Sequence, residues 1–219
     1  MKIEGSSIAF IVICTGLVFL MTPALAFFYG GLERRKNVIS TMMMSVVSLA
    51  LATVMWFAVG YSLSFSGDGN LIGDLGHAFF QGVSDAESTR GLTIPDSLFA
   101  VFQMMFSIIT VGILTGSVAG RMRFKPLLIF IVGWLLLVYY PFAHMVWDGG
   151  LLAQWGTIDF AGGDVVHISS GVSGLVACIM LGKRRGYGLM SYKPHNIPFV
   201  FLGYIVVSVG GVNSLTAGI

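Results

Sequence analysis

Residues 7–31 read SIAFIVICTGLVFLMTPALAFFYGG, a stretch that contains no Asp, Glu, Lys or Arg. A helix that crosses a lipid bilayer needs roughly 20 mainly apolar residues, so this stretch is long enough to cross. Four later stretches are also long enough, and a last one, which starts around Pro198, is expected to form part of a sixth span. The predicted spans are 7–31, 38–65, 96–120, 126–147, 163–182 and 197–212.

The composition indicates a membrane protein. Of the 219 residues, 56% are hydrophobic and 10% are charged, and the mean hydropathy is +0.88. A soluble domain usually carries about 25% charged residues, so this chain has too little polar surface to coat a globule in water. We therefore predict an all-α integral membrane fold, with residues 1–219 forming one transmembrane domain.

Several classes of function are disfavoured by the same residues. The sequence contains no basic patch with interleaved aromatic residues, which argues against a nucleic-acid partner. Cys14 and Cys178 lie inside apolar stretches and indicate neither a disulfide framework nor a metal site. We interpret both as small buried apolar side chains. An enzyme that uses His167 and Asp159 would lack a nucleophile–base pair at suitable spacing, so we expect no enzyme, metal or cofactor.

Local signals mark the ends of the spans. Gly30-Gly31 closes the first span, and Lys125-Pro126 opens the fourth. Residues 66–95, which hold Gly, Ser, Asp and Pro, are expected to form an external loop. The Ala-Leu-Ala sequence at 24–26 also fits the cleavage pattern of a signal peptide. The N-terminal residues before the span carry one Lys and one Glu, and the apolar run continues through residues 27–29. Both features favour a span that is retained, and both interpretations stay open.

The charged residues alternate from one side of the predicted membrane to the other. Ten of the twelve Lys and Arg residues lie in the loops after spans one, three and five, whereas nine of the ten acidic residues lie elsewhere. Basic loops favour the cytoplasmic side, so we predict an external N-terminus in a multi-pass protein of the cell membrane. The ten basic residues are Arg34, Arg35, Lys36, Arg121, Arg123, Lys125, Lys183, Arg184, Arg185 and Lys193.

His167 is a candidate for chemistry because it lies in the first turns of the fifth span. Polar side chains at membrane depth are costly and are functional candidates. Small residues follow it, and small residues let helix backbones approach closely. The imidazole is therefore either packed in a helix interface or exposed to a pore. The small residues are Ser169, Ser170, Gly171, Ser173 and Gly174.

Asp159 also has two interpretations. It precedes the fifth span, so it could cap and orient the start of that helix. It could instead provide a negative field for a cation. A carboxylate that bound a permeating cation directly would tend to trap it, which favours the capping role.

Three aromatic residues could attract a cation. Phe102 and Phe106 are four residues apart and share a helix face, and Trp147 ends the fourth span. Aromatic faces attract cations, more strongly when the cation is partly desolvated. Core packing for the two phenylalanines and a membrane-interface position for Trp147 are the alternatives.

Taken together, these stretches resemble the ammonium transporter family, Amt/MEP/Rhesus, over roughly residues 8–203. The run from Asp159 to Gly163 is close to the signature of that family, and Trp147 with Phe106 resembles the Amt branch. The matching stretches are FFYGGL at 27–32, KNV at 36–38, FQMMF at 102–106, AHMVW at 143–147, DFAGG at 159–163, VH at 166–167 and KPHN at 193–196.

The resemblance implies a mechanism of ammonium transport. Trp147 resembles the outer cation-binding aromatic residue, and Phe106 one of two stacked gate rings, with Phe102 beside it. Asp159 resembles the carboxylate that shapes this site, and His167 the first of two pore histidines. Ammonium would lose its proton near the gate, since a bare cation is expensive in an apolar pore, and ammonia would pass along the imidazoles.

The resemblance also implies an architecture and partners. Members have eleven helices built as two inverted repeats, and this chain corresponds to the first repeat with part of a sixth helix. Residues 204–219 depart from the family pattern, so the second gate ring and the vestibule serine cannot be assigned there. Homotrimers and PII-type signal proteins at the cytoplasmic face are implied for a full-length protein. The alternative is a truncated, non-conducting fragment or a regulatory half that binds membrane partners.

Overall fold

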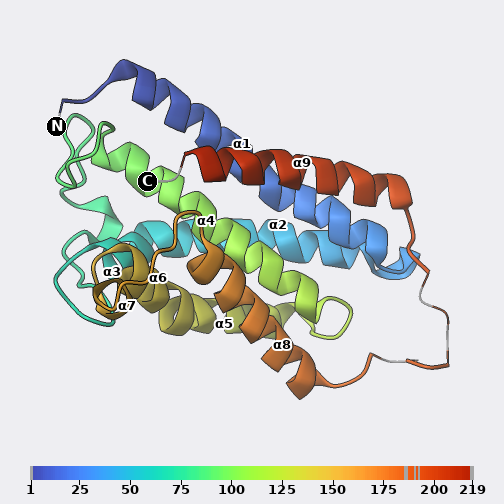
Figure 1. The fold of residues 1–219 in the computed structure, drawn as a ribbon. Coiled ribbons are helices and arrows are strands. Elements are labelled where there is room, and N and C mark those ends of the chain that lie inside the picture. The colour runs from blue at the N-terminus through green and yellow to red at the C-terminus, as the bar shows by residue number, and fades with distance from the viewer. Residues whose placement is uncertain (1, 185–186, 190, 192, 218–219) are drawn as a thin grey trace.

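The computed structural model describes residues 2–184, 187–189, 191 and 193–217. Over these residues the chain consists of helices and connecting loops, without strands. The long helices run roughly side by side, with the N-terminus and the loop of residues 66–95 gathered at one end (Figure 1). Six helical segments within the described residues are long and apolar enough to cross a membrane. The predicted all-α fold is confirmed.

The helices coincide with the predicted spans to within a few residues at each end. The second and fourth spans each contain a π-helical turn, so each of them consists of three consecutive parts. The bounds are α1 (Gly5–Leu32), η1 (Arg35–Asn37), α2 (Val38–Met55), η2 (Trp56–Gly60), α3 (Tyr61–Phe65), η3 (Ala78–Phe80), α4 (Asp96–Val118), α5 (Phe124–Trp134), η4 (Leu135–Tyr139), α6 (Tyr140–Trp147), α7 (Leu151–Gln154), η5 (Gly163–Ile168), α8 (Ser169–Leu181) and α9 (Ile197–Thr216).

The sixth span is longer than expected. The sequence predicted part of a span, but α9 has 20 residues, which is enough to cross a bilayer. It lies along α1, as Figure 1 shows. Glycines allow this close approach, because a Cβ atom on Gly203 would lie 2.6 Å from the Ala24 carbonyl oxygen and one on Gly210 would lie 2.3 Å from Met21. The packing against α1 therefore holds this helix in place.

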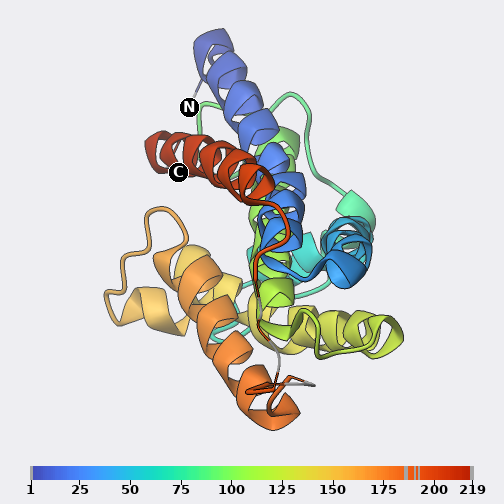
Figure 2. The same cartoon turned by 90° about the vertical axis from the view of Figure 1, so that its right-hand side faces the viewer.

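Helix α4 lies at the centre of the fold. Helices α1, α2 and α8 pack against it, and Figure 2 shows it between α5 on one side and α8 and α9 on the other. Large apolar side chains on the outer helices are instead exposed, among them Met180 at 82%, Leu137 at 79% and Ile129 at 76%. Exposed patches of this kind suit a lipid surface, so the chain is a multi-pass membrane protein with a packed centre.

Small residues bring α8 close to α4. A Cβ atom on Gly174 would lie 2.3 Å from the hydroxyl oxygen of Ser117. Ser170 is buried on the same face, and Cys178, half-buried, donates its thiol hydrogen to the Ser117 carbonyl oxygen at 3.0 Å. Gly171, beside this face, meets open space. One face of α8 therefore packs on α4 and the other is free.

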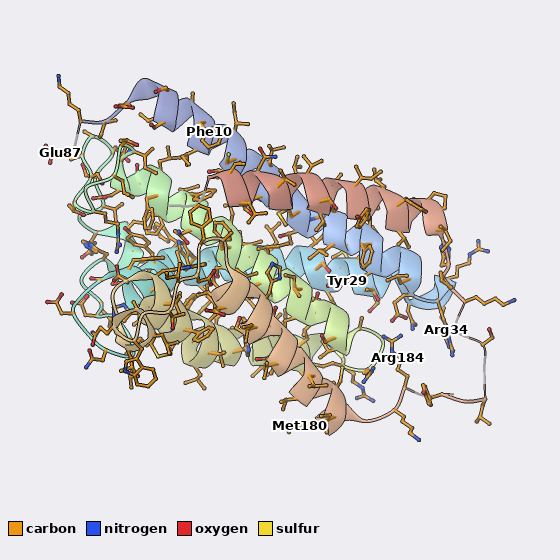
Figure 3. All side chains as sticks on the ribbon, viewed as in Figure 1. Phe10, Tyr29, Arg34, Glu87, Met180 and Arg184 are labelled. Carbon is orange, nitrogen blue, oxygen red and sulfur yellow. The ribbon has the colours of Figure 1, made fainter. Side chains whose placement is uncertain are left out.

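The two ends of the fold carry opposite charges. Arg34 and Arg184 lie at one end and Glu87 at the other (Figure 3). Glu33, the one acidic residue on the basic side, is 5% exposed and forms an ion pair with Arg184 at 3.0 Å. Its charge is therefore compensated locally. Arg185, counted among the basic residues, lies outside the described residues.

Candidate functional site

Three aromatic rings from two helices form a continuous row. The ring centroids of Phe102 and Phe106, one turn apart on α4, are 5.1 Å apart with the rings perpendicular. Trp147, the last residue of α6, contacts Phe106 edge to face, at 5.9 Å between centroids. Both phenylalanines are buried, whereas Trp147 is half-buried. The predicted shared face of Phe102 and Phe106 is confirmed, and Trp147 extends the row toward the surface.

Asp159 caps the start of the fifth span. Its Oδ1 atom accepts hydrogen bonds from the backbone N–H groups of Gly162 and Gly163, at 2.7 and 2.8 Å. Its Oδ2 atom accepts from those of Asp164 and Val165, both at 2.9 Å. Four N–H groups at a helix start thereby gain an acceptor. Because both carboxylate oxygens are engaged, a cation nearby would meet the field of this carboxylate rather than a free oxygen.

The cap and the row of rings are joined by the chain around Asp159. The indole Nε1 of Trp147 donates a hydrogen bond to the Asp159 carbonyl oxygen at 3.0 Å. Gly162 then turns the chain into η5 with a φ of 85°, which a residue with a side chain rarely adopts. A Cβ atom at this position would also lie 2.7 Å from the Val166 side chain. The DFAGG sequence therefore fixes Trp147 relative to the start of the fifth span.

An apolar cavity of about 340 Å³ lies behind Phe106. Its walls come from α1, α4, α9 and the segment from Ala161 to His167, and among the residues that line it His167 is the one titratable side chain. Phe106 belongs both to this wall and to the aromatic row. The lining residues are Val18, Met21, Leu25, Phe106, Ile109, Ile113, Ala161, Gly163, Val166, His167, Val207, Gly211, Ser214 and Leu215.

The imidazole of His167 is exposed on the free face of the fifth span. Within the described part of the chain, neither of its ring nitrogens has a hydrogen-bond partner. Its backbone carbonyl accepts from the Ser170 hydroxyl, so the backbone is engaged while the ring is not. The ring of His167 is therefore exposed among the described residues and is not packed between two helices.

Ser214 on α9 also belongs to this region, although the sequence did not indicate it. It lines the apolar cavity and a second, small cavity with Trp147, Phe106 and Phe160. Its hydroxyl donates to the Gly211 carbonyl oxygen at 2.8 Å and is 8% exposed as a residue. The spacing of Val207, Gly211 and Ser214 along one helix face could have indicated this position.

A group of charged residues beside Trp147 was also missed. We call Arg90, His144 and Asp148 the outer clamp. Arg90 Nη2 donates to Asp148 Oδ1 at 2.7 Å and to the Phe65 carbonyl oxygen at 2.8 Å. His144 Nδ1 lies 3.4 Å from Asp148 Oδ2. Arg90 is 58 residues from Asp148 in the sequence, so only the spacing of four between His144 and Asp148 could have suggested a contact.

The sequence pattern of the Ammonium Transporter Family matches residues 9–213. The chain belongs to this family. It is 49% identical over 201 residues to an ammonium transporter of Bacillus subtilis, in a match that covers 92% of this chain and 49% of that protein. Because members of the family are transport proteins, the expectation that the chain is no enzyme is confirmed.

Two solved structures place the fold in the same family. The crystal structure of Saccharomyces cerevisiae Mep2 superposes with a TM-score of 0.88 at 34% identity and covers all of this chain and 52% of that one. A protein described as a Sensor Amt Protein superposes with a TM-score of 0.86 at 28% identity, over 97% of this chain and 55% of that one. The chain thus spans about half the length of these ammonium transporter relatives.

Proposed function

We propose that the chain forms half of a pathway that carries ammonium or ammonia across the membrane. The observation that carries this proposal is the position of Phe106. On one side it contacts Trp147, the half-buried end of the aromatic row, and on the other it lines the apolar cavity with His167. A small cation attracted at the first position would reach the second by passing this ring.

Recruitment of the cation would depend on Trp147. A tryptophan face attracts a cation by about 0.5–2 kcal/mol, and the attraction grows as water is removed. Asp159 supports this role in two ways. Its backbone carbonyl oxygen orients the indole of Trp147, and its carboxylate, held by four N–H groups, places a negative charge nearby. The carboxylate would raise the local concentration of cations without binding one tightly.

The cavity beyond Phe106 favours neutral ammonia over the ammonium cation. The cavity is lined mainly by aliphatic side chains, which cannot replace the hydration of a cation. An imidazole can act as donor and acceptor to a small neutral molecule, and the ring of His167 has both nitrogens available. We infer that ammonium transfers its proton to water on the outer side of Phe106, which leaves hydronium there, and that the resulting ammonia moves past His167.

The proposed orientation follows from the separation of charges. With Arg34 and Arg184 on the cytoplasmic side, Glu87 and the loop of residues 66–95 to which it belongs face the outside (Figure 3). Asp85 and Arg123 are exposed at the two ends. The background carries Cys14→Ala and Cys178→Ser. In it, a membrane-impermeant maleimide should label Asp85→Cys in intact cells and should label Arg123→Cys only after lysis. The reverse pattern would contradict the orientation.

The proposed partners are those of a complete transporter. We propose homotrimers, with PII-type signal proteins at the basic side, for the protein that carries this sequence; the description of one relative as a sensor is compatible with a signalling partner. Cross-linking in native membranes followed by mass analysis would test both assemblies. A monomer without a signal-protein partner would contradict this part of the proposal.

Uptake of ¹⁴C-methylammonium by cells that express the protein carrying this sequence tests the function. We expect saturable uptake that ammonium inhibits, and a large loss with Phe106→Ala if this ring separates the two parts of the pathway. A matched control is Phe142→Ala, a half-buried ring on α6 that lines neither cavity. Absence of uptake in well-expressed protein would favour the non-conducting alternative.

A further inference from the structure

The buried imidazole of His144 lies between two carbonyl oxygens. His144 is 0% exposed. Its Nε2 atom is 2.6 Å from the Gly69 carbonyl oxygen, and its Nδ1 atom is 3.2 Å from the Ser64 carbonyl oxygen. A carbonyl oxygen can only accept a hydrogen bond, so each ring nitrogen needs its own hydrogen. A neutral imidazole has one N–H, and the imidazolium has two.

Asp148 provides the negative charge that an imidazolium needs in a buried place. Its Oδ2 atom lies 3.4 Å from Nδ1 of His144, and its Oδ1 atom accepts from Arg90 at 2.7 Å. The guanidinium of Arg90 also lies 4.9 Å from the ring centroids of Phe65 and Phe99. A protonated Asp148 that donated to a bare Nδ1 is the alternative. Burial favours this neutral carboxyl group, whereas the charge and hydrogen bond of Arg90 favour the carboxylate, and the histidine spectrum described below distinguishes the two.

We propose that His144 is held as an imidazolium and that the outer clamp, Arg90, His144 and Asp148, positions Trp147 for cation recruitment. Two clamp residues flank Trp147 at the end of α6, since Asp148 follows it directly and His144 precedes it by three residues. They tie that turn to the end of α3 and to the loop of residues 66–95. This inference rests on the proposed function for its transport consequence and on geometry alone for the protonation state.

Other charged groups near the clamp lie on the loop of residues 66–95 and at the start of α4, where Asp96 lines a polar cavity together with Arg90 and Asp148. Asp68 and Asp74 are within electrostatic reach of Asp148 and His144 respectively. Hydrogen bonds from the Ser66 hydroxyl and the Gly76 N–H hold the pKa of Asp74 below its usual range, so this carboxylate stays anionic beside the imidazolium. This polar cavity, of about 310 Å³, adjoins the clamp. That volume is ample for water, so solvent can reach the ion pair.

The protonation state can be measured without any transport assay. The protein that carries this sequence, labelled with ¹⁵N-histidine and reconstituted in lipid, should show one buried histidine with two protonated ring nitrogens at neutral pH. The signal should disappear in His144→Gln and persist in His77→Gln, whose Nδ1 faces a single carbonyl oxygen, that of Gln81. A His144 signal with one protonated and one bare nitrogen would overturn the proposal.

The positioning role is tested by the kinetics of three variants. Asp148→Asn should raise the apparent KM for methylammonium by about fivefold, the loss expected when an aromatic cation site is displaced, with a smaller change in the maximal rate. Asp148→Glu should restore part of the affinity, and Asp85→Asn, an exposed acid at the same end, should leave KM unchanged. Equal KM values for Asp148→Asn and the parent would overturn the positioning role. Absence of uptake in the parent would contradict the proposed function and leave the histidine spectrum as the deciding measurement of the clamp.

Discussion

Two histidines of this chain, His144 in α6 and His167 in η5, differ in almost every physical respect. His144 is fully buried, and both of its ring nitrogens face carbonyl oxygens. His167 is exposed on the free face of the fifth span, and its ring has no hydrogen-bond partner among the described residues. The first imidazole is fixed by its surroundings, whereas the second is free to interact with a passing molecule.

In the proposed pathway, one side-chain type would serve structure at His144 and transport at His167. A buried polar group that loses its partners costs about 1–3 kcal/mol, so His144 must stay where it is. A group without partners has no such cost to overcome when it binds a small neutral molecule. Substitution at the two positions should therefore separate folding stability from transport.

The largest loss of folding stability is expected for His144→Ala. It removes a buried charge partner of Asp148 and leaves the carbonyl oxygens of Ser64 and Gly69 without a donor, a loss of about 3 kcal/mol. Thermal unfolding in detergent should show a markedly lower Tm than the parent. The control His77→Ala, at a half-buried ring with one hydrogen bond, should shift Tm little. Equal shifts in Tm for both variants would mean that the buried contacts of His144 contribute no more to folding stability than the single hydrogen bond of His77.

A smaller loss is expected for Asp159→Ala. Four backbone N–H groups would lose their acceptor, and loss of a helix cap costs about 2 kcal/mol at the upper end of the measured range. Asp164→Ala is the matched control, because this acid lies in the first turn of η5 and its side chain makes no hydrogen bond within the described residues. If both variants lowered Tm equally, the loss would come from charge near the helix start and not from the cap.

Smaller still is the expected effect of Trp147→Leu on folding, about 1 kcal/mol for a half-buried ring that loses its contact with Phe106. Apparent affinity for methylammonium should fall by about fivefold, the equivalent of one cation–aromatic contact. Trp155→Leu is the control, since this residue is 73% exposed and lies outside the aromatic row. A kinetic profile equal to that of the parent would make Trp147 an interface residue only.

The sequence predicts most of the fold because the length and hydropathy of a span are local properties. The cap made by Asp159 and the shared face of Phe102 and Phe106 were also predictable, since each depends on residues close together in the chain. The length of α9 was underestimated because the polar residues Asn213, Ser214 and Thr216 weaken the apolar signal, while packing against α1 holds the helix.

The surroundings of the two histidines could not be predicted in the same way. His144 contacts carbonyl oxygens 80 and 75 residues away, and Asp148 contacts Arg90 at a separation of 58. Backbone carbonyls are common to all residues and leave no sequence signal. For His167, helix packing and pore exposure were both compatible with the small residues after it. The sequence does not say which face of α8 packs on α4, where Ser170 and Gly174 are buried and Gly171 meets open space.

The smallest change in folding stability is expected for His167→Leu. The imidazole has no hydrogen-bond partner to lose within the described residues, and leucine adds an apolar side chain to an apolar cavity. The free energy of unfolding should therefore change by no more than about 0.5 kcal/mol, and Tm should shift little. Transport should nevertheless fall, because a pathway without the imidazole offers ammonia neither a donor nor an acceptor at this depth. The matched control is Val166→Leu, at the neighbouring position on the cavity wall. A variant that keeps the parent's Tm and loses uptake assigns His167 to transport, whereas a large loss of Tm would show that this histidine, like His144, holds the fold together.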